Sequence, residues 1–308
     1  METAICTLFE GDYHRGLGAL VNSLCKYGYR GVVWAGHRGA LPPWAQPLIQ
    51  GEGYEEFRLP AGVSVRFLAV DTEVHLTNYK PDFMLRVWDH EAPKAQKLFY
   101  FDPDIVVKCE WVFFEDWVEG GVALCEDINS PMPGSHPIRN TWRRFYGAKG
   151  FPLTRNPDAY VNAGFLGVTR ENRRLLETWK QLLVAVRDET GPLDQLGFGN
   201  RPYAFYNADQ DVLNAALMAC EVDVSLVGKE GMDFIPGGYI MSHAIGKAKP
   251  WRKQMLKSAL GGQPPTLADK SFWENVETPI RLWPSGSLLF RKLDLTVASA
   301  LGRLLRRA

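Results

Sequence analysis

The sequence predicts an α/β fold in which a Rossmann-like, mostly parallel mixed sheet is flanked by helices. Three observations support this prediction. Apolar runs of strand length alternate along the chain with segments whose apolar residues recur at helical spacing. The 308 residues are 46% apolar and 23% charged, which is ordinary globular composition. Polar and charged clusters follow several of the expected strands, where α/β sheets bind their ligands.

Charge and cysteine content exclude several classes of protein. Thirty-five basic and 35 acidic residues give a formal net charge of zero, so we expect no nucleic-acid partner. The five cysteines are widely spaced and form no CxxC pair, which argues against a disulfide framework or a zinc site and favours a cytoplasmic protein. The N-terminus resembles a first strand more than a signal peptide, and no apolar run is long enough to span a membrane.

The N-terminal part alternates strongly between the two types of element. Apolar runs predict strands at residues 4–9 and 31–36, and Gly28 is placed to end a helix between them. That helix is predicted by apolar residues at helical spacing: Leu17, Leu20, Val21, Leu24 and Cys25. A strand at 64–70, an amphipathic helix at 83–90 and a strand at 97–101 follow. This succession predicts parallel pairing with right-handed crossovers.

The second half continues the pattern with two interruptions. We expect a helix at 111–118, strands at 122–125 and 159–168, and helices at 171–186 and 209–220. Residues 129–158 and 191–206 are rich in Gly and Pro and are predicted to be long active-site loops or lids. The first contains Trp142, Arg143, Arg144, Phe145 and Tyr146, which form either an acceptor platform or a buried anchor of the loop.

The C-terminus is predicted to form a basic amphipathic helix. From Arg281 onward there are six basic residues and one acid. An apolar stripe is expected from Leu293, Val297, Ala300, Leu301 and Leu304. Such a helix either lies on an anionic membrane surface or docks on the body of the fold, and both interpretations stay open.

Two carboxylates end the apolar run at 97–101. Asp102 and Asp104 are separated by one residue, so in an extended chain both side chains point to the same side and reach one divalent cation. The alternative is a strand-end loop with two solvated acids.

A second polar cluster combines His243, Gly246 and Lys249. The imidazole and two carboxylates would make a mixed nitrogen and oxygen set that suits Mn²⁺ better than Ca²⁺, and Lys249 would supply a point charge for a diphosphate. A histidine on a strand is otherwise a satisfied structural residue.

Residues 207–214 begin a predicted helix with several polar side chains. N-capping by Asn207 or Asp209 is the favoured interpretation, and a hydrogen-bonding cluster that faces a sugar, with Gln210 and Asp211, is the alternative. In the strand at 159–168, Asn162, Ala163 and Gly164 would allow a ligand to approach the backbone, unless they form a bulge.

Three residues after the first strand are candidates for binding a nucleotide. Tyr13 could stack on a base, and Glu10 and Asp12 could hold the base or ribose. No G-x-G-x-x-G follows that strand, so a dinucleotide site is not expected.

Taken in order, these motifs resemble glycosyltransferase family 8, the group that contains glycogenin and bacterial lipopolysaccharide galactosyltransferases. The resemblance covers residues 3–252 and is most specific in its last motif. It rests on Asp102-Pro-Asp104, Val161-Asn-Ala-Gly164, Asp209-Gln-Asp211 followed by Leu213-Asn214, and His243-x-x-Gly246-x-x-Lys249-Pro-Trp251. It implies a GT-A catalytic domain at 1–252, followed by a helical extension at 253–308.

The resemblance also implies roles for the matching residues. Asp102, Asp104 and His243 would hold Mn²⁺, with Mg²⁺ as the alternative, and Gly246 and Lys249 would meet the diphosphate. The donor would also be bound by Glu10, Asp12, Tyr13, Asn162 and Ala163. A basic residue upstream of Asp102, either Arg86 or Lys80, would help to bind the donor, and Glu126 or Asp127 would contact sugar hydroxyls.

The expected reaction is transfer of a hexose with retention of configuration from a UDP-sugar to a saccharide or glycolipid acceptor. The carbonyl dipole of Gln210 would stabilise the sugar cation, while Asp209 or Asp211 orients the sugar. The enzyme would work in the cytoplasm, with peripheral membrane contact through its C-terminal helix, in polysaccharide or lipopolysaccharide biosynthesis. The rival interpretation is a sugar-nucleotide-binding regulatory or scaffold protein that does not catalyse transfer.

Overall fold

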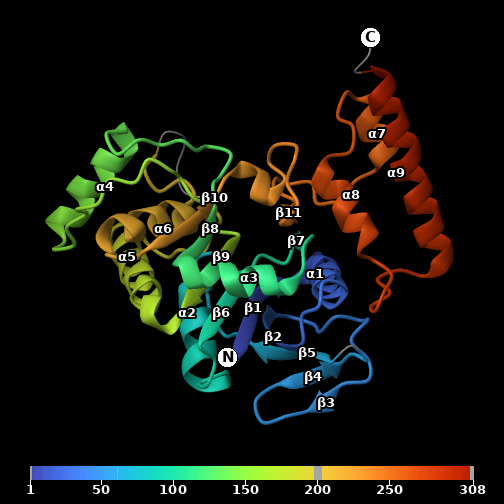
Figure 1. The fold of residues 1–308 in the computed structure, drawn as a ribbon, viewed down its shortest axis with the longest axis horizontal. Coiled ribbons are helices and arrows are strands. Elements are labelled where there is room, and N and C mark those ends of the chain that lie inside the picture. Colours follow the sequence, from blue (N-terminus) through green and yellow to red (C-terminus); the bar gives the residue numbers. More distant parts are fainter. Residues whose placement is uncertain (1, 61, 198–202, 306–308) are drawn as a thin grey trace.

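The computed structural model describes residues 2–60, 62–197 and 203–305 of the protein and confirms the predicted α/β class (Figure 1). A nine-stranded mixed sheet has the order β10-β8-β9-β6-β1-β2-β5-β4-β3. Its strands are β1 (Thr3–Glu10), β2 (Gly31–Arg38), β3 (Ile49–Gln50), β4 (Glu55–Arg58), β5 (Val63–Ala69), β6 (Lys97–Phe101), β8 (Val122–Cys125), β9 (Phe165–Thr169) and β10 (Val224–Val227).

The centre of the sheet is parallel, as predicted. Strand β1 pairs with β2 on one side and with β6 on the other, and β2 pairs with β5, all in parallel. Strand β9 is antiparallel to both β6 and β8, and β4 is antiparallel to β5. Residues 4–9 of β1 are buried because helices cover both faces of the sheet, which explains their nearly continuous apolar sequence.

Helices pack on both faces of the sheet. The helices of the described residues are α1 (His14–Lys26), α2 (Lys80–Arg86), α3 (Trp111–Trp117), α4 (Pro137–Ala148), α5 (Arg174–Thr190), α6 (Ala208–Ala219), α7 (Met255–Leu260), α8 (Leu267–Glu274) and α9 (Ser285–Leu305). Of these, α1, α2, α3, α5 and α6 cover the sheet. One hydrophobic cluster joins the sheet to α2, α5 and α6, and a second joins its other face to α1 and α3. Gly28, with φ 86°, follows the end of α1 as expected for a C-terminal glycine.

A short second sheet determines where the polar cluster lies. Strand β7 (Ile105–Val107) pairs antiparallel with β11 (Met241–His243), and His243 lies opposite Ile105. The sequence analysis did not predict β7 or this pairing, because three-residue strands give little periodic signal.

Two predicted segments differ from the structure. The strand expected from 159 begins only at Phe165, and before it Val161 forms an isolated bridge with Glu126. Residues 129–158 are not a continuous loop, because α4 occupies Pro137–Ala148 and starts with a proline in its first turn. The other expected loop, 191–206, lies partly outside the described residues.

The C-terminal helices lie together on the side of α1, away from α4, α5 and α6 (Figure 1). Helix α7 packs along α9, and α8 contacts β7 and β11. A third hydrophobic cluster joins Ala19 of α1 and Val106 of β7 to Trp251, Phe272 and Trp283. Among the helices that the structure describes, none combines the length and apolar character needed to cross a membrane.

Candidate active site

Asp102, Asp104 and His243 meet at the end of β6. Each residue offers one ligand atom, and these atoms lie within 4.8 Å of one another. His243 Nε2 is 3.3 Å from Asp104 Oδ1 and 3.9 Å from Asp102 Oδ2, because the β7–β11 pairing brings His243 beside the two carboxylates. One nitrogen and two carboxylate oxygens suit a first-row divalent cation, so the residues present fit such a metal.

Gly164, directly before β9, makes room for the imidazole of His243. A Cβ atom on Gly164 would lie 2.4 Å from Cε1 of His243, a distance that side-chain carbons do not tolerate. The carbonyl oxygen of Gly164 also accepts a hydrogen bond of 2.7 Å from the backbone nitrogen of Asp102. Gly164 therefore lets the segment before β9 pass close to His243 and Asp102, and no bulge is needed to explain it.

Lys249 pairs with one of the carboxylates. Its Nζ lies 2.5 Å from Asp104 Oδ2 and donates to the carbonyl oxygen of Ala244 at 2.9 Å. Burial by itself would raise the pKa of the Asp104 carboxyl, but the electrostatic effects of His243 and Lys249 outweigh it and hold that pKa well below its usual range. Asp104 is therefore ionised throughout the physiological pH range.

Lys80 neutralises the other carboxylate and joins it to α6. Its Nζ lies 3.0 Å from Asp102 Oδ1 and 3.0 Å from Asp209 Oδ2, and it donates to the carbonyl oxygen of Ala163 at 2.9 Å. Its side chain is 1% exposed. Burial lowers the pKa of Lys80, but the two carboxylates raise it more, so the amine stays charged.

Arg86, the alternative basic residue on α2, does not reach this group. Its guanidinium lies 3.6 Å from Glu91 and donates to the carbonyl oxygen of Ala69. The structure thus brings Lys80, rather than Arg86, to Asp102.

The start of α6 departs from the favoured capping interpretation. Asn207 occupies the N-cap position, but its side chain makes no capping bond, and Asp209 binds Lys80 instead. The carboxylate of Asp211 accepts from the Asn207 backbone at 2.9 Å and from the Tyr160 hydroxyl at 2.7 Å. Burial, with Asp209 nearby, raises the pKa of Asp211 to about 7 despite these bonds.

Side chains of α6 also hold the segment that precedes β9. Gln210 Oε1 accepts from the Ala163 backbone nitrogen at 3.2 Å, and Asn214 makes hydrogen bonds of 2.9 Å to both the nitrogen and the carbonyl oxygen of Val161. Asn162 donates from Nδ2 to Asp127 Oδ2 at 2.8 Å. The motifs at 161–164 and 209–214 therefore form one hydrogen-bonded unit.

The predicted nucleotide-binding residues lie at the end of β1 and in the turn that follows it. Glu10 forms an ion pair of 2.9 Å with Arg38, and Asp12 accepts from Arg252 at 2.8 Å. The Tyr13 ring lies edge-on to Trp251, with Lys249 Nζ 5.8 Å from its centroid. The hydrogen bonds from Arg252, which outweigh partial burial, lower the pKa of the Asp12 carboxyl.

These side chains surround one cleft of about 550 Å³, a size that accommodates a small-molecule ligand. Ten of the predicted site residues line it: Glu10, Tyr13, Asp102, Asp104, Asn162, Asp209, Gln210, His243, Gly246 and Lys249. Asp12, Arg86, Ala163 and Asp211 do not line it. The backbone of Ala163 still forms hydrogen bonds with Lys80 and Gln210. The carboxylate of Asp211 accepts hydrogen bonds from the Tyr160 hydroxyl and the Asn207 backbone.

Two solved structures of glycosyltransferases are similar to this fold. No family model and no curated protein matches the chain. The solved structure of the bifunctional glycosyltransferase WbbM is similar, with a TM-score of 0.56 and 17% identity over 94% of this chain and 51% of that one. GlyE, a glycosyltransferase of Streptococcus pneumoniae TIGR4, gives a TM-score of 0.51 and 16% identity over 96% of this chain and 64% of that one. The fold is GT-A. The chain spans about half and just under two thirds of the lengths of these two proteins.

Glu126 and Asp127 follow the end of β8 directly and lie in different hollows. Asp127 lines the cleft and holds Asn162, whereas Glu126 lies in a different hollow and accepts from the Ser130 hydroxyl at 2.9 Å. Of the two acids expected to contact a sugar, the structure brings Asp127 to the cleft.

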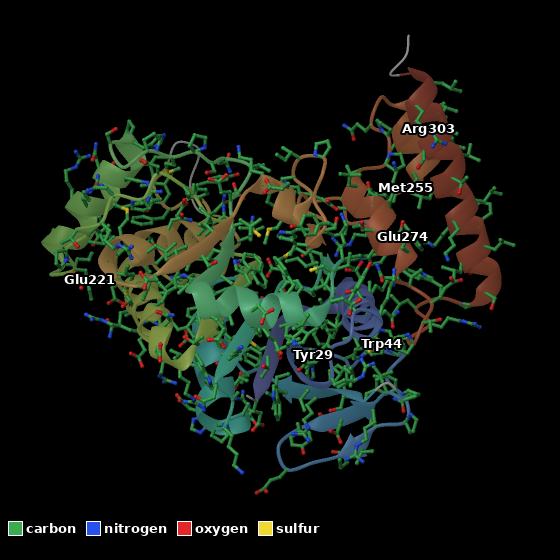
Figure 2. All side chains as sticks on the ribbon, in the orientation of Figure 1. Tyr29, Trp44, Glu221, Met255, Glu274 and Arg303 are labelled. Atoms are coloured by element: carbon green, nitrogen blue, oxygen red, sulfur yellow. The ribbon has the colours of Figure 1, made fainter. Side chains whose placement is uncertain are left out.

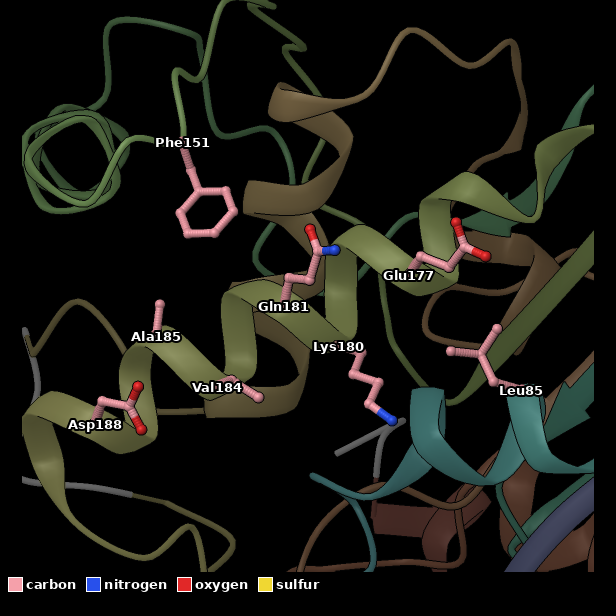
Figure 3. A pocket seen from close by; sticks show the side chains of 8 residues that line it. All are labelled: Leu85, Phe151, Glu177, Lys180, Gln181, Val184, Ala185 and Asp188. Atoms are coloured by element: carbon pink, nitrogen blue, oxygen red, sulfur yellow. The ribbon is translucent and has the colours of Figure 1, made fainter.

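The aromatic residues of the segment at 142–146 serve mainly as an anchor. Trp142 and Tyr146 are fully buried, and the Trp142 indole donates to the carbonyl oxygen of Ala204 at 2.5 Å. A separate hollow of about 430 Å³ beside α5 contains none of the predicted site residues (Figure 3). It is lined by Leu85, Phe151, Glu177, Lys180, Gln181, Val184, Ala185 and Asp188.

Several residues that line the cleft were not named as site residues by the sequence analysis, and two of them are polar side chains close to the predicted site, Tyr100 and His75. Tyr100 donates to Asp102 Oδ1 at 3.0 Å, and strand alternation already places it on the same side as Asp102. His75 lies in a turn after β5, within the cleft lining, and no motif marks it. The first residue had a detectable signal and the second had none.

Proposed function

We propose that the protein is a metal-dependent glycosyltransferase of the family 8 type, which moves a hexose from a UDP-sugar to a saccharide or lipid-linked glycan. One observation carries the proposal. A single cleft brings the cation triad, Lys249 and the Asp209–Gln210 pair together, and Lys80 links the triad directly to Asp209. These are the groups needed at a diphosphate and at the sugar attached to it.

Different side chains would contact the three parts of the donor, which are the nucleoside, the diphosphate and the hexose. Tyr13 and Glu10 would contact the nucleoside, together with Asp12, which reaches this region through Arg252. Lys249 and the backbone at Gly246, whose φ is 92°, would meet the diphosphate. Asn162, Ala163 and Asp209 would hold the hexose, with Asp211 as a support beneath them.

The transfer step needs stabilisation of charge at both ends of one bond. The bond between the anomeric carbon and the diphosphate oxygen breaks, and the electron pair leaves with the nucleoside diphosphate. When bound, Mn²⁺ or Mg²⁺ supplies electrostatic stabilisation of that leaving group. Lys249 adds a positive charge at the same oxygens, and the Gln210 carbonyl dipole faces the cationic sugar.

Retention of configuration would follow from attack on the same face. The acceptor hydroxyl oxygen forms the new bond to the anomeric carbon, and its proton passes to the departing phosphate oxygen. No protein carboxylate then needs to form a bond with the sugar. Gln210, a weak nucleophile, is consistent with this route.

The test is a thermal-shift screen followed by turnover. Purified protein is melted with UDP, GDP, CDP or ADP and their sugar conjugates, in the presence of Mn²⁺ or EDTA, because a ligand of the folded state raises the melting temperature. We expect a Mn²⁺-dependent shift with UDP and one UDP-sugar.

Asp102→Ala should abolish that shift and reduce transfer by roughly a thousandfold, since a metal contributes several kcal/mol to charge stabilisation. Asp116→Ala, at an exposed position of α3, is the matched control. Near-normal turnover of Asp102→Ala would refute the proposal. Tight UDP binding without hydrolysis or transfer to any acceptor would favour the regulatory alternative.

A further inference from the structure

An apolar stripe covers the outer side of α9 and has no role in the proposed transfer. Its side chains are Leu289, Phe290, Leu293, Val297 and Leu304, which are 73%, 73%, 58%, 39% and 68% exposed. At 100° per residue they fall within a sector of about 100° on the helix surface. Figure 2 shows side chains extending from this outer side of α9 (dark red) into solvent.

The opposite side of α9 is already used for packing. Leu288 and Ala298 are buried in the C-terminal cluster, and Asp294 accepts hydrogen bonds of 2.9 Å from the backbone nitrogens of Met255 and Leu256 at the start of α7. The Arg291 guanidinium lies 5.5 Å from the centroid of the Trp283 ring. Docking on the body of the fold therefore accounts for one face of α9 and leaves the stripe unexplained.

The stripe is unusual for this molecule. Among the described residues, the four most exposed large apolar side chains are Leu260, Leu289, Phe290 and Leu304, and all belong to the C-terminal helices. Leu260 ends α7, which packs along α9. Contiguous exposed apolar surface of this kind marks an interaction site.

Charge distinguishes between the partners that could cover it. Residues 253–308 contain nine basic and four acidic residues, a formal charge of +5, whereas the whole chain has a charge of zero. Arg303 is exposed, and helical geometry places it and Lys292 along one edge of the stripe. A second copy would present the same positive charge and be repelled, while an anionic lipid surface would attract it.

We propose that the outer face of α9 binds an anionic lipid bilayer, with the helix lying in the interfacial plane and its apolar stripe inserted among the headgroups. The apolar side chains supply the area buried in the interface, and the basic residues of the C-terminal segment supply the attraction to anionic headgroups. This contact would hold the catalytic cleft next to a membrane. The proposal is independent of the transfer activity.

The experiment is co-sedimentation of the full-length protein with vesicles of phosphatidylcholine, with or without phosphatidylglycerol. We expect binding only to the vesicles that contain phosphatidylglycerol, and weaker binding as salt increases. The double variant Phe290→Glu and Leu293→Glu should bind at least about tenfold more weakly, because it places in the stripe two negative charges that the anionic headgroups repel. Val112→Glu, at a 59% exposed apolar position of α3, is the control and should bind like the wild type.

Folding and alternative partners are checked in the same samples. Both variants replace exposed side chains, so circular dichroism and melting temperature should match those of the wild type. Absence of wild-type binding to either vesicle, or binding by the double variant at the wild-type level, would overturn the proposal. A concentration-dependent dimer, abolished in the double variant, would assign the stripe to a second copy and would overturn it as well.

Discussion

At the scale of single residues, the cleft depends on a buried lysine between two carboxylates. Lys80 contacts Asp102, Asp209 and the Ala163 carbonyl oxygen while remaining almost entirely buried. A buried carboxylate without a counter-charge lowers the free energy of unfolding, because no ion pair then offsets the cost of removing it from water. Lys80 therefore stabilises the Asp102 and Asp209 carboxylates at once.

We predict that Lys80→Met lowers the free energy of unfolding by about 3 kcal/mol and abolishes donor binding, because Asp102 and Asp209 lose their shared cation. Arg86→Met removes a basic side chain from the same helix, outside the cleft, and should change stability by less than about 1 kcal/mol. Urea unfolding and the thermal shift with UDP and Mn²⁺ measure both effects. If Arg86→Met lost donor binding while Lys80→Met kept it, the assignment would be reversed.

Asp211 makes stability depend on pH in a defined direction. Its pKa is raised by burial to about 7, so the folded state binds a proton that the unfolded state has released above pH 3.8. Its contribution to stability is therefore present below pH 3.8 and is lost as pH rises to 7, by up to about 4 kcal/mol.

The variant Asp211→Asn resembles the protonated carboxyl in shape and charge. We predict that it retains the fold and removes this decline between pH 4 and pH 7, so that the variant is the more stable protein at pH 7. Melting temperatures across this pH range measure the effect. An unchanged pH profile would show that Asp211 is ionised in the folded protein.

At the scale of elements, α1 is held close to the loop between β6 and β7. A Cβ on Gly16 would lie 2.3 Å from the carbonyl oxygen of Pro103, which separates Asp102 from Asp104. The obstructing atom belongs to the backbone, so α1 and the loop must move apart to accommodate any side chain. The position of α1 is thus coupled through one glycine to the loop that contains Asp102 and Asp104.

Gly16→Ala should consequently weaken Mn²⁺-dependent UDP binding by at least about tenfold while leaving the secondary structure intact. Gly147→Ala in α4 is the control, because no atom lies within 4 Å of its added Cβ, and it should be neutral or stabilising by up to about 1 kcal/mol. Isothermal titration with UDP and Mn²⁺ compares the two. Wild-type affinity of Gly16→Ala would show that the loop tolerates displacement.

The elements also show which parts of the structure are readable in the sequence. Strands β1, β2 and β6 are central and continuously apolar, so their positions were predicted closely. Strand β11 is only three residues long, and nothing local indicates that it pairs with β7 to bring His243 to Asp104. Helix α4 was not predicted, because Arg, Asn and Gly interrupt the apolar residues that would have indicated a helix there.

For the site itself, the motifs identified the residues better than they identified the contacts between those residues. Asp102, Asp104, His243 and Lys249 were predicted and lie together. The choice between Lys80 and Arg86 was left open, although Lys80 shares a helix face with Phe83, Met84 and Val87, all of which are buried. A lysine on the apolar face of a helix indicates a buried partner, and that signal was available.

At the scale of the whole molecule, the C-terminal helices are integrated with the first helix rather than appended to the fold. The buried side chain of Asn22 in α1 donates to the carbonyl oxygens of Asn275 and Ile280 at 2.9 and 2.8 Å and accepts from the Ile280 nitrogen at 2.7 Å. The division at residue 252 thus remains a proposal about function, since the two parts share packing and hydrogen bonds.

The Asn22 contact also constrains the order of events during synthesis. Its two carbonyl partners lie 253 and 258 residues further along the chain. At ribosomal rates of about 5 to 20 residues per second, α1 waits roughly 10 to 50 s for them. During that interval the face of α1 that later packs against the C-terminal helices is uncovered, so the nascent chain offers a binding surface to chaperones that the finished protein no longer has.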